Sequence, residues 1–147
     1  MKPTTILVPT DFSDASLEAK AYGVTLAKAF GASLHLIHVL TDPVTLGWGV
    51  EQAYLPQMLE RIEADARAQL EALSPPAERK ALDVQVSVEI GSPAEKILAY
   101  ADGHGVDMIV MGTHGRGAVE RLWVGSVTER VLRHASCPVV SVRRLRS

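Results

Sequence analysis

The sequence predicts an α/β fold in which an open, twisted, five-stranded parallel sheet has the strand order 3-2-1-4-5 and carries helices on both faces. The first observation behind this prediction is that apolar runs of strand length alternate with stretches of helical period along the 147 residues. The second is that two of these runs, Ile6–Val8 and Met108–Met111, contain no polar residue. Such runs are typical of strands buried on both faces, and the order 3-2-1-4-5 places the first and fourth strands at the centre.

The composition favours one globular domain that spans residues 1–147. Hydrophobic residues make up 47% of the chain and charged residues 22%, which excludes a disordered protein. The net charge of −2 makes nucleic acid an unlikely partner, while eight basic against five acidic side chains from residue 91 onward favour an anion site in the second half. The single cysteine, Cys137, and the short apolar runs indicate a cytoplasmic protein with no membrane association.

The first half of the chain is predicted to supply two strands and two helices. The strands are expected at Thr4–Val8 and Ser33–Leu40. The helix between them is expected over about Ser13–Phe30, with Ser13 as its N-cap and Gly31 as its terminator. A long amphipathic helix follows, and Ser74-Pro75-Pro76 ends it. Its apolar face contains Leu55, Leu59, Ile62, Ala66, Leu70 and Leu73.

The second half is predicted to supply three strands and two helices. The strands are expected at Asp83–Ile90, Asp107–Met111 and Pro138–Val142. The first of these alternates apolar with polar residues, as an edge strand does. Each helix is expected to begin at a capping box, either Ser92-Pro93-Ala94-Glu95 or Ser126-Val127-Thr128-Glu129.

The strand order also predicts where a ligand binds. In a doubly wound sheet the chain turns in opposite directions after the two central strands, and their carboxyl ends flank a crevice. The residues expected there are Pro9-Thr10-Asp11 and Gly112-Thr113-His114-Gly115. We therefore expect the site to lie between these two loops.

The glycine-containing loop after the fourth strand has the composition of a phosphate cradle. Gly112, Gly115 and Gly125 allow backbone N–H groups to approach an anion, and the first turn of the last helix, at Val127, adds N–H donors and the positive end of a helix dipole. The loop is neither a Walker A motif, because no Gly-Lys-Ser/Thr ends it, nor a Rossmann motif, because it follows the fourth strand. Side chains that could add a cation or a hydroxyl donor are Arg116, Arg121, Ser126 and Thr128.

These motifs resemble those of a known family. The spacing Gly112-x2-Gly115-x9-Gly125-Ser126, the loop Pro9-Thr10-Asp11 and the start of the last helix are similar to the ATP-binding branch of the universal stress proteins. The resemblance covers essentially the whole chain, and the spaced glycines are the pattern that separates the nucleotide-binding branch from the branch that binds none. It implies an adenine nucleotide alpha hydrolase-like fold with an ATP site at the predicted crevice.

The resemblance also implies roles for individual residues. Pro9-Thr10-Asp11 would lie against the adenosine, and the backbone at Val39 would meet the adenine edge. Met111 and Gly112 would pack near the ribose. The phosphates would be held by Gly115, Gly125, Ser126 and Val127.

Three polar features need separate interpretation, and two of them leave alternatives open. Asp11 could bind a ribose hydroxyl or, through water, Mg²⁺, and it could instead form an Asx-turn or cap the first helix. His114 could contact a phosphate, but the sequence supplies no nucleophile and orienting carboxylate around it. His35 and His38 are three apart on a predicted strand, so they point to opposite faces and cannot chelate one ion.

The sequence favours an ATP-binding protein that acts as a nucleotide-dependent regulatory or protective module in a stress response. ATP turnover is expected to be slow or absent, because the cradle has no counterpart of the P-loop lysine. The alternatives are an adenine-nucleotide hydrolase or transferase on the same fold and an interaction module that binds no nucleotide. A homodimer is expected through the apolar edge strand. The residues of that edge are Val139, Val140, Ser141 and Val142.

Overall fold

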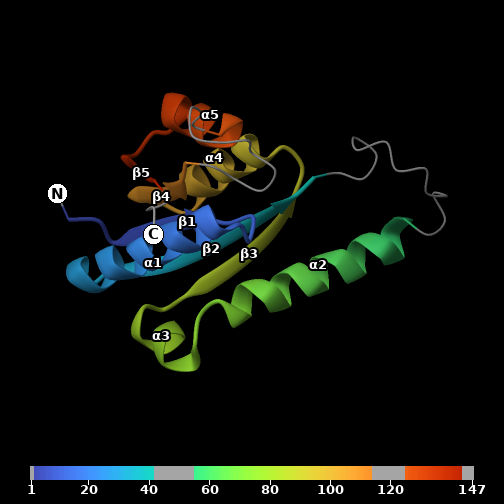
Figure 1. Ribbon diagram of the computed structural model, residues 1–147, viewed down its shortest axis with the longest axis horizontal. Helices are drawn as coiled ribbons and strands as arrows, with labels where there is room; N and C mark the ends of the chain where they lie inside the picture. The colour runs from blue at the N-terminus through green and yellow to red at the C-terminus, as the bar shows by residue number, and fades with distance from the viewer. Residues whose placement is uncertain (1, 42–54, 114–124, 144–147) are drawn as a thin grey trace.

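The computed structural model describes residues 2–41, 55–113 and 125–143, which contain five strands and five helices (Figure 1). The strands are β1 (Thr5–Pro9), β2 (Ser33–Leu40), β3 (Gln85–Ile90), β4 (Met108–Gly112) and β5 (Val139–Val142). The helices are α1 (Asp14–Phe30), α2 (Leu55–Ala72), α3 (Pro76–Ala81), α4 (Pro93–Gly103) and α5 (Ser126–His134).

The strands form one parallel sheet in the order β3-β2-β1-β4-β5, which confirms the predicted order. The register of the central pairs runs from Thr5↔Ser33 to Pro9↔Ile37 on one side of β1, and it includes Leu7↔Ile109 on the other. β3 and β5 are therefore the two edges, and β1 is central, as expected.

Helices cover both faces of the sheet, and each face has its own apolar layer (Figure 1). Ile6 and Val8 pack with apolar residues of α1 and α2, whereas Leu7 and Ile109 pack with those of α4 and α5. All four side chains are fully buried, because β1 and β4 have neighbours on both edges and both faces.

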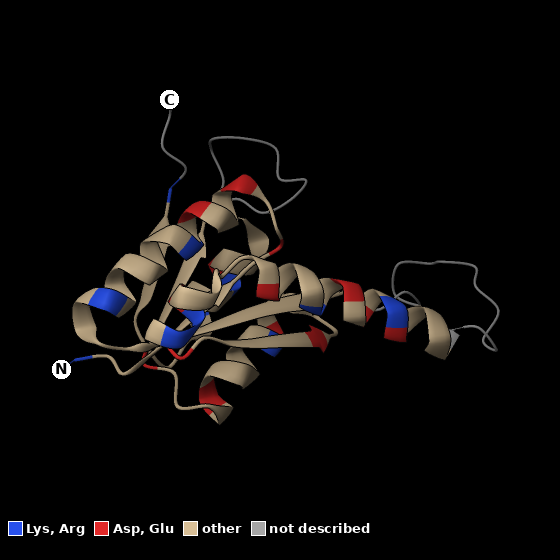
Figure 2. Cartoon of the chain, turned by 90° about the horizontal axis from the view of Figure 1, so that it is seen from below, with Lys and Arg blue, Asp and Glu red and all other residues tan. Residues whose placement is uncertain are grey.

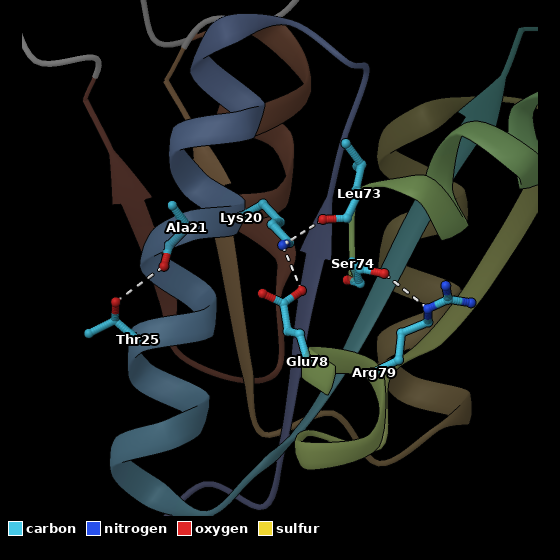
Figure 3. Close-up of polar contacts among 7 residues, drawn as sticks. All are labelled: Lys20, Ala21, Thr25, Leu73, Ser74, Glu78 and Arg79. Atoms are coloured by element: carbon cyan, nitrogen blue, oxygen red, sulfur yellow. Dashed lines mark hydrogen bonds and ion pairs between the residues drawn. The ribbon is translucent and has the colours of Figure 1, made fainter. Parts of the chain in front are cut away.

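Helix α3 was not predicted, because the sequence Ser74-Pro75-Pro76 indicated only the end of the long helix. Pro76 instead opens a second helix, whose first turn needs no N–H donor from that residue. The corner between α2 and α3 is tied to α1 by Lys20, whose ammonium donates to Glu78 Oε2 at 2.7 Å and to the Leu73 carbonyl at 2.8 Å (Figure 3). Lys20 and Glu78 are only 12% and 16% exposed, so this ion pair fixes α3 against the body of the fold.

The amino-terminal part of α2 extends beyond the sheet (Figures 1 and 2). The buried residues of this helix, Ala66 and Leu70, lie in its carboxyl-terminal half, and Leu73 just beyond it packs against the same core. The predicted apolar face is therefore confirmed at these positions. No helix in the described ranges combines the length and the apolar character that crossing a bilayer requires.

The helix caps agree only in part with the prediction. Ser13 caps α1 by accepting from Ser16 N–H, and Gly31 ends that helix at φ 67°, as expected. Neither predicted capping box forms its side-chain bond. Ser92 is the N-cap residue of α4 but makes no such bond, and Gly125 rather than Ser126 is the N-cap of α5. Gly125 takes the cap position because its carbonyl accepts from Glu129 N–H at 2.9 Å, so the helix starts one residue earlier than predicted, and its own N–H donates to the Thr113 carbonyl.

Candidate functional site

The candidate site is the edge of the sheet where the central strands β1 and β4 end. We call this region the switch point, and it comprises residues 9–13, residues 112–113 and the first turn of α5. Its parts are held together by close contacts. A Cβ at Gly112 would lie 2.7 Å from the carbonyl oxygen of Ala15 in the first turn of α1, so only glycine allows α1 to approach β4 this closely.

On the β1 side, every polar group of Thr10 is bonded within the protein. Its N–H donates to the Ile37 carbonyl at 2.9 Å, and its carbonyl oxygen lies 2.8 Å from His38 Nδ1. Its hydroxyl accepts from Phe12 N–H at 3.0 Å and shares a hydrogen bond with Ser16 Oγ at 2.9 Å. Thr10 is 5% exposed, so its side chain is part of the scaffold that shapes this loop.

Asp11 forms an Asx-turn, which is one of the structural roles expected for it. Its Oδ1 accepts from Ser13 N–H at 3.0 Å and also from the Ser13 hydroxyl, and Ser13 in turn caps α1. Phe12 between them has a φ of 65°, which a bulky residue rarely adopts. Such a conformation persists only when its surroundings hold it, here through Thr10 and through the His38 ring, whose centroid lies 4.6 Å from that of Phe12.

On the β4 side, a buried hydroxyl lies next to an uncapped helix end. Thr113 is 8% exposed, and its Oγ1 has no hydrogen-bond partner among the described residues. α5 begins directly beyond it with no side-chain cap, so the N–H groups of its first turn have no partner within the helix. Of the residues there, Ser126 is exposed and Val127 half-buried, whereas the Thr128 hydroxyl donates to the Gly112 carbonyl at 2.8 Å.

The backbone of Val39 faces the switch point. The odd-numbered residues of β2 pair toward β1, since Ser33 N–H donates to the Thr4 carbonyl and the Ile37 carbonyl accepts from Thr10 N–H. The register with β1 stops at Pro9↔Ile37. Val39 is the next odd-numbered residue, so its N–H and carbonyl point into the space beyond the end of β1.

Of the remaining predicted residues, some lie in the described part of the chain and others lie outside it. Met111 is buried at 5% exposure on the face of α4 and α5, and Pro9 is buried at the end of β1. His114, Gly115 and Arg116 lie outside the described residues, as does Arg121. Within the described ranges, no group of three or more His, Cys, Asp or Glu side chains is arranged to hold a metal ion.

Two residues shape this region in ways that sequence reasoning missed. Thr113 follows Gly112 in the predicted loop, but nothing in the sequence indicates that its hydroxyl is buried without a partner. His38 was considered only as a metal ligand. The signal that could have found it is its place near the carboxyl end of a strand rich in apolar residues, because a polar side chain there needs a hydrogen-bond partner.

The two histidines of β2 do point to opposite faces, as predicted. His35 lies on the α4 face, where its Nδ1 is 2.7 Å from the Tyr100 hydroxyl and its ring is buried. Burial lowers the pKa of His35, and the nearby His104 lowers it further while Asp83 opposes them. His104 stacks on Tyr100 with ring centroids 3.7 Å apart. This cluster lies toward the amino ends of the strands, away from the switch point.

Comparison with known proteins identifies the family. The family model described as the universal stress protein family matches residues 3–143. A universal stress protein of Thermus aquaticus is 41% identical over 140 residues, which cover 95% of this chain and 98% of that protein. The structure of the universal stress protein UspA from Lactobacillus plantarum superposes with a TM-score of 0.78 at 29% identity, covering 97% of this chain and 99% of that one.

A further solved structure, of a universal stress protein in complex with cAMP, has the same fold, with a TM-score of 0.62 at 23% identity over 97% of this chain and 98% of that one. The match of the family model and the identity to the Thermus relative extend over nearly the whole length of the sequence. The chain therefore belongs to the universal stress protein family.

Proposed function

We propose that this protein binds ATP at the switch point and uses it as a regulatory ligand in a stress response. The adenine would meet the Val39 backbone, the ribose would lie near Asp11 and Gly112, and the phosphates would reach the first turn of α5. The predicted glycines and Arg116 complete the phosphate side of this proposal. Bound nucleotide would then alter the surface that the protein offers to partners.

The observation that carries the proposal is the buried Thr113 hydroxyl, which has no partner among the described residues, beside a start of α5 that has no side-chain cap. An unpaired buried hydroxyl costs about 1–3 kcal/mol, and a helix N-terminus attracts anions. Both features are therefore unfavourable in an empty site and become favourable when a phosphate accepts from them. The Thr128 hydroxyl is already bonded to Gly112, so we assign only its N–H to the phosphates.

The nucleotide class is supported by a relative of the same fold. The universal stress protein described above that was solved in complex with cAMP shows that one member of this fold accepts an adenine nucleotide. A backbone edge such as that of Val39 offers both a donor and an acceptor, which is what the edge of adenine requires. We therefore expect adenine to be preferred over guanine, which presents the opposite pattern at this edge.

Mg²⁺ belongs to the proposal as an ion carried by the nucleotide. Magnesium keeps several water ligands and is commonly held by phosphate oxygens with one or two carboxylates. Asp11 is the carboxylate in the loop after β1, and its Oδ1 already accepts two hydrogen bonds. We expect it to act through water, with the phosphates supplying the direct ligands.

Calorimetric titration with ATP, AMP and GTP tests this function. The wild type is expected to bind ATP with one site per chain and to bind GTP at least tenfold more weakly. Gly115→Val, which adds a branched side chain where the phosphates are expected, should weaken ATP binding while the protein remains folded. If wild-type protein stripped of bound nucleotide shows no saturable ATP binding, the proposal is wrong.

We propose slow or no turnover of the bound nucleotide. The described part of the switch point supplies N–H donors and hydroxyls, which stabilise a phosphate without activating water. The measurement is phosphate release compared with nucleotide dissociation in the same preparation. Several turnovers per second that are lost in His114→Ala, with binding retained, would instead favour the hydrolase alternative.

We also propose a homodimer through β5, with the protein acting in the cytoplasm. β5 is an edge of the sheet, Val139, Val140 and Val142 are partly exposed, and pairing with a second copy would satisfy this edge. Light scattering at micromolar concentration should give twice the mass of the chain. Val140→Lys should shift that mass toward the monomer, and a wild-type monomer would contradict the proposal.

A further inference from the structure

A side-chain hydrogen bond lies at the end of the β1–β2 ladder. In a parallel ladder that continued past Pro9↔Ile37, the next bond would run from Val39 N–H to the Thr10 carbonyl. In the described part of the chain that carbonyl is instead bonded to His38 Nδ1 at 2.8 Å, and Val39 N–H does not reach it. The imidazole therefore takes the place of a backbone donor.

This hydrogen bond fixes the tautomer of His38. A carbonyl oxygen only accepts, so Nδ1 must carry the proton in the neutral ring. The ring is also held by Phe12, whose centroid lies 4.6 Å away and whose strained φ of 65° carries the chain out of the strand direction. Thr10 is anchored on its other sides by Ile37 and Ser16, so the carbonyl stays where the imidazole meets it.

We infer that His38 is a positioning residue that keeps the Val39 backbone open for the nucleobase. By occupying the Thr10 carbonyl, it prevents the β1–β2 ladder from gaining the next hydrogen bond, from Val39 N–H. The Val39 N–H is therefore left pointing into the switch point. The role in nucleobase binding rests on the proposed function, whereas the effect of His38 on the ladder does not depend on it. We expect His38 to strengthen binding of the nucleoside part of the ligand and to leave binding of the phosphates unchanged.

Two substitutions separate the donor from the bulk of the ring. Asn places an N–H donor close to the position of Nδ1, so His38→Asn should preserve the bond to Thr10. His38→Leu keeps the volume and removes the donor, which leaves the Thr10 carbonyl free to pair with Val39 N–H. His35→Leu is the matched control, because it removes a hydrogen-bonded histidine from the opposite face of the same strand.

The first measurement needs no ligand. Amide hydrogen exchange followed by NMR should show Val39 N–H poorly protected in the wild type and in His38→Asn, and at least tenfold more protected in His38→Leu. Nitrogen chemical shifts of the imidazole should show the proton on Nδ1. A proton on Nε2, or a Val39 amide that is already protected in the wild type, would overturn the inference even if a variant fails to fold.

The second measurement is binding of AMP, ATP and magnesium tripolyphosphate. His38→Leu should weaken AMP and ATP by about tenfold and leave tripolyphosphate within twofold, while His38→Asn stays within threefold of the wild type for all three. His35→Leu should lower stability without changing AMP affinity. Unchanged AMP affinity in folded His38→Leu, or an equal loss for tripolyphosphate, would overturn the inference. A wild type that binds none of the three would instead overturn the proposed function, which the exchange measurement does not depend on.

Discussion

The two sides of the switch point each bury a threonine, and the two hydroxyls are in opposite states. Thr10 follows β1 and Thr113 follows β4, and they are 5% and 8% exposed. The Thr10 hydroxyl bonds to Phe12 and Ser16, whereas the Thr113 hydroxyl has no partner among the described residues. The same residue type at the same depth is thus satisfied on one side and unsatisfied on the other.

This difference shows which side has its hydrogen bonds satisfied within the fold itself. The β1 side is rigidified by its own hydrogen bonds, from Asp11 and Ser13 at the cap of α1 to His38 on β2. In the described part of the chain, the β4 side ends in a hydroxyl without a partner and a helix without a side-chain cap, which are groups that a ligand can satisfy. We therefore expect loss of the Thr10 hydroxyl to change stability, and loss of the Thr113 hydroxyl to change binding.

The largest expected effect comes from Gly112, where the two sides touch. Gly112→Ala should lower the free energy of unfolding by roughly 2–3 kcal/mol, because the added Cβ would lie 2.7 Å from the Ala15 carbonyl oxygen and backbone cannot swing away. Urea denaturation measures this change. Gly103→Ala is the control, since a Cβ at Gly103 meets nothing within 4 Å and the change should be close to neutral or stabilising. Equal stability of the two variants would show that the sides are not in tight contact.

Thr10→Val should destabilise the protein by about 1–2 kcal/mol, because it leaves the Phe12 N–H without its acceptor and removes the bond to Ser16. Thr10→Ser keeps the hydroxyl and should recover most of the loss. Thermal unfolding of the three proteins at one pH provides the measurement. If Thr10→Val is as stable as the wild type, the β1 side does not depend on its internal bonds.

The sequence predicts the fold of this protein well because its pattern is dictated by burial. The runs Ile6–Val8 and Met108–Met111 can only be central strands in a sheet covered on both faces, and both are central in the structure. The location of the switch point then follows from the strand order alone. The short helix α3 was missed because proline at a helix start and proline at a helix end look the same in a sequence.

The details of the site were less predictable because they depend on tertiary partners. Ser126 is the expected cap of α5, but Gly125 holds that place, and its N–H bonds to the carbonyl of Thr113, a residue that a capping motif does not include. The partners of Thr10 lie on a loop, a helix and a neighbouring strand, and no local pattern specifies which of them a hydroxyl or a carbonyl meets. The proposed contacts of Gly115 and Arg116 remain predictions from the motif.

Thr113→Val should have the opposite effect to Thr10→Val. The methyl group fills the place of a hydroxyl that lacks a partner, so the nucleotide-free protein should be unchanged or gain up to about 1 kcal/mol. ATP affinity should fall about fivefold to tenfold, and Thr113→Ser should retain it. Unfolding and ATP titration of the same samples test the expected stability and the expected affinity, respectively. A loss of stability with unchanged affinity would place Thr113 in the scaffold and remove the contrast between the two sides.

The smallest expected effect is a pH dependence of the free energy of unfolding that arises from His35 on β2. Burial lowers the pKa of His35 below its ordinary value of 6.5, with His104 acting in the same direction. The unfolded chain then binds this proton more tightly than the folded chain, so the free energy of unfolding falls as the pH drops through 6.5 and the contribution of His35 is complete above that value.

Urea unfolding from pH 7.5 to 5.5 should show a steeper decline in the free energy of unfolding for the wild type than for His35→Gln, which cannot titrate. As the pH is lowered, the protection of amides from hydrogen exchange, relative to the intrinsic rate at each pH, should fall in β2 before it falls in β4. The reason is that His35 and its partner Tyr100 join β2 to α4. The same pH dependence in both proteins would mean that the neutral state of His35 does not contribute to the free energy of unfolding.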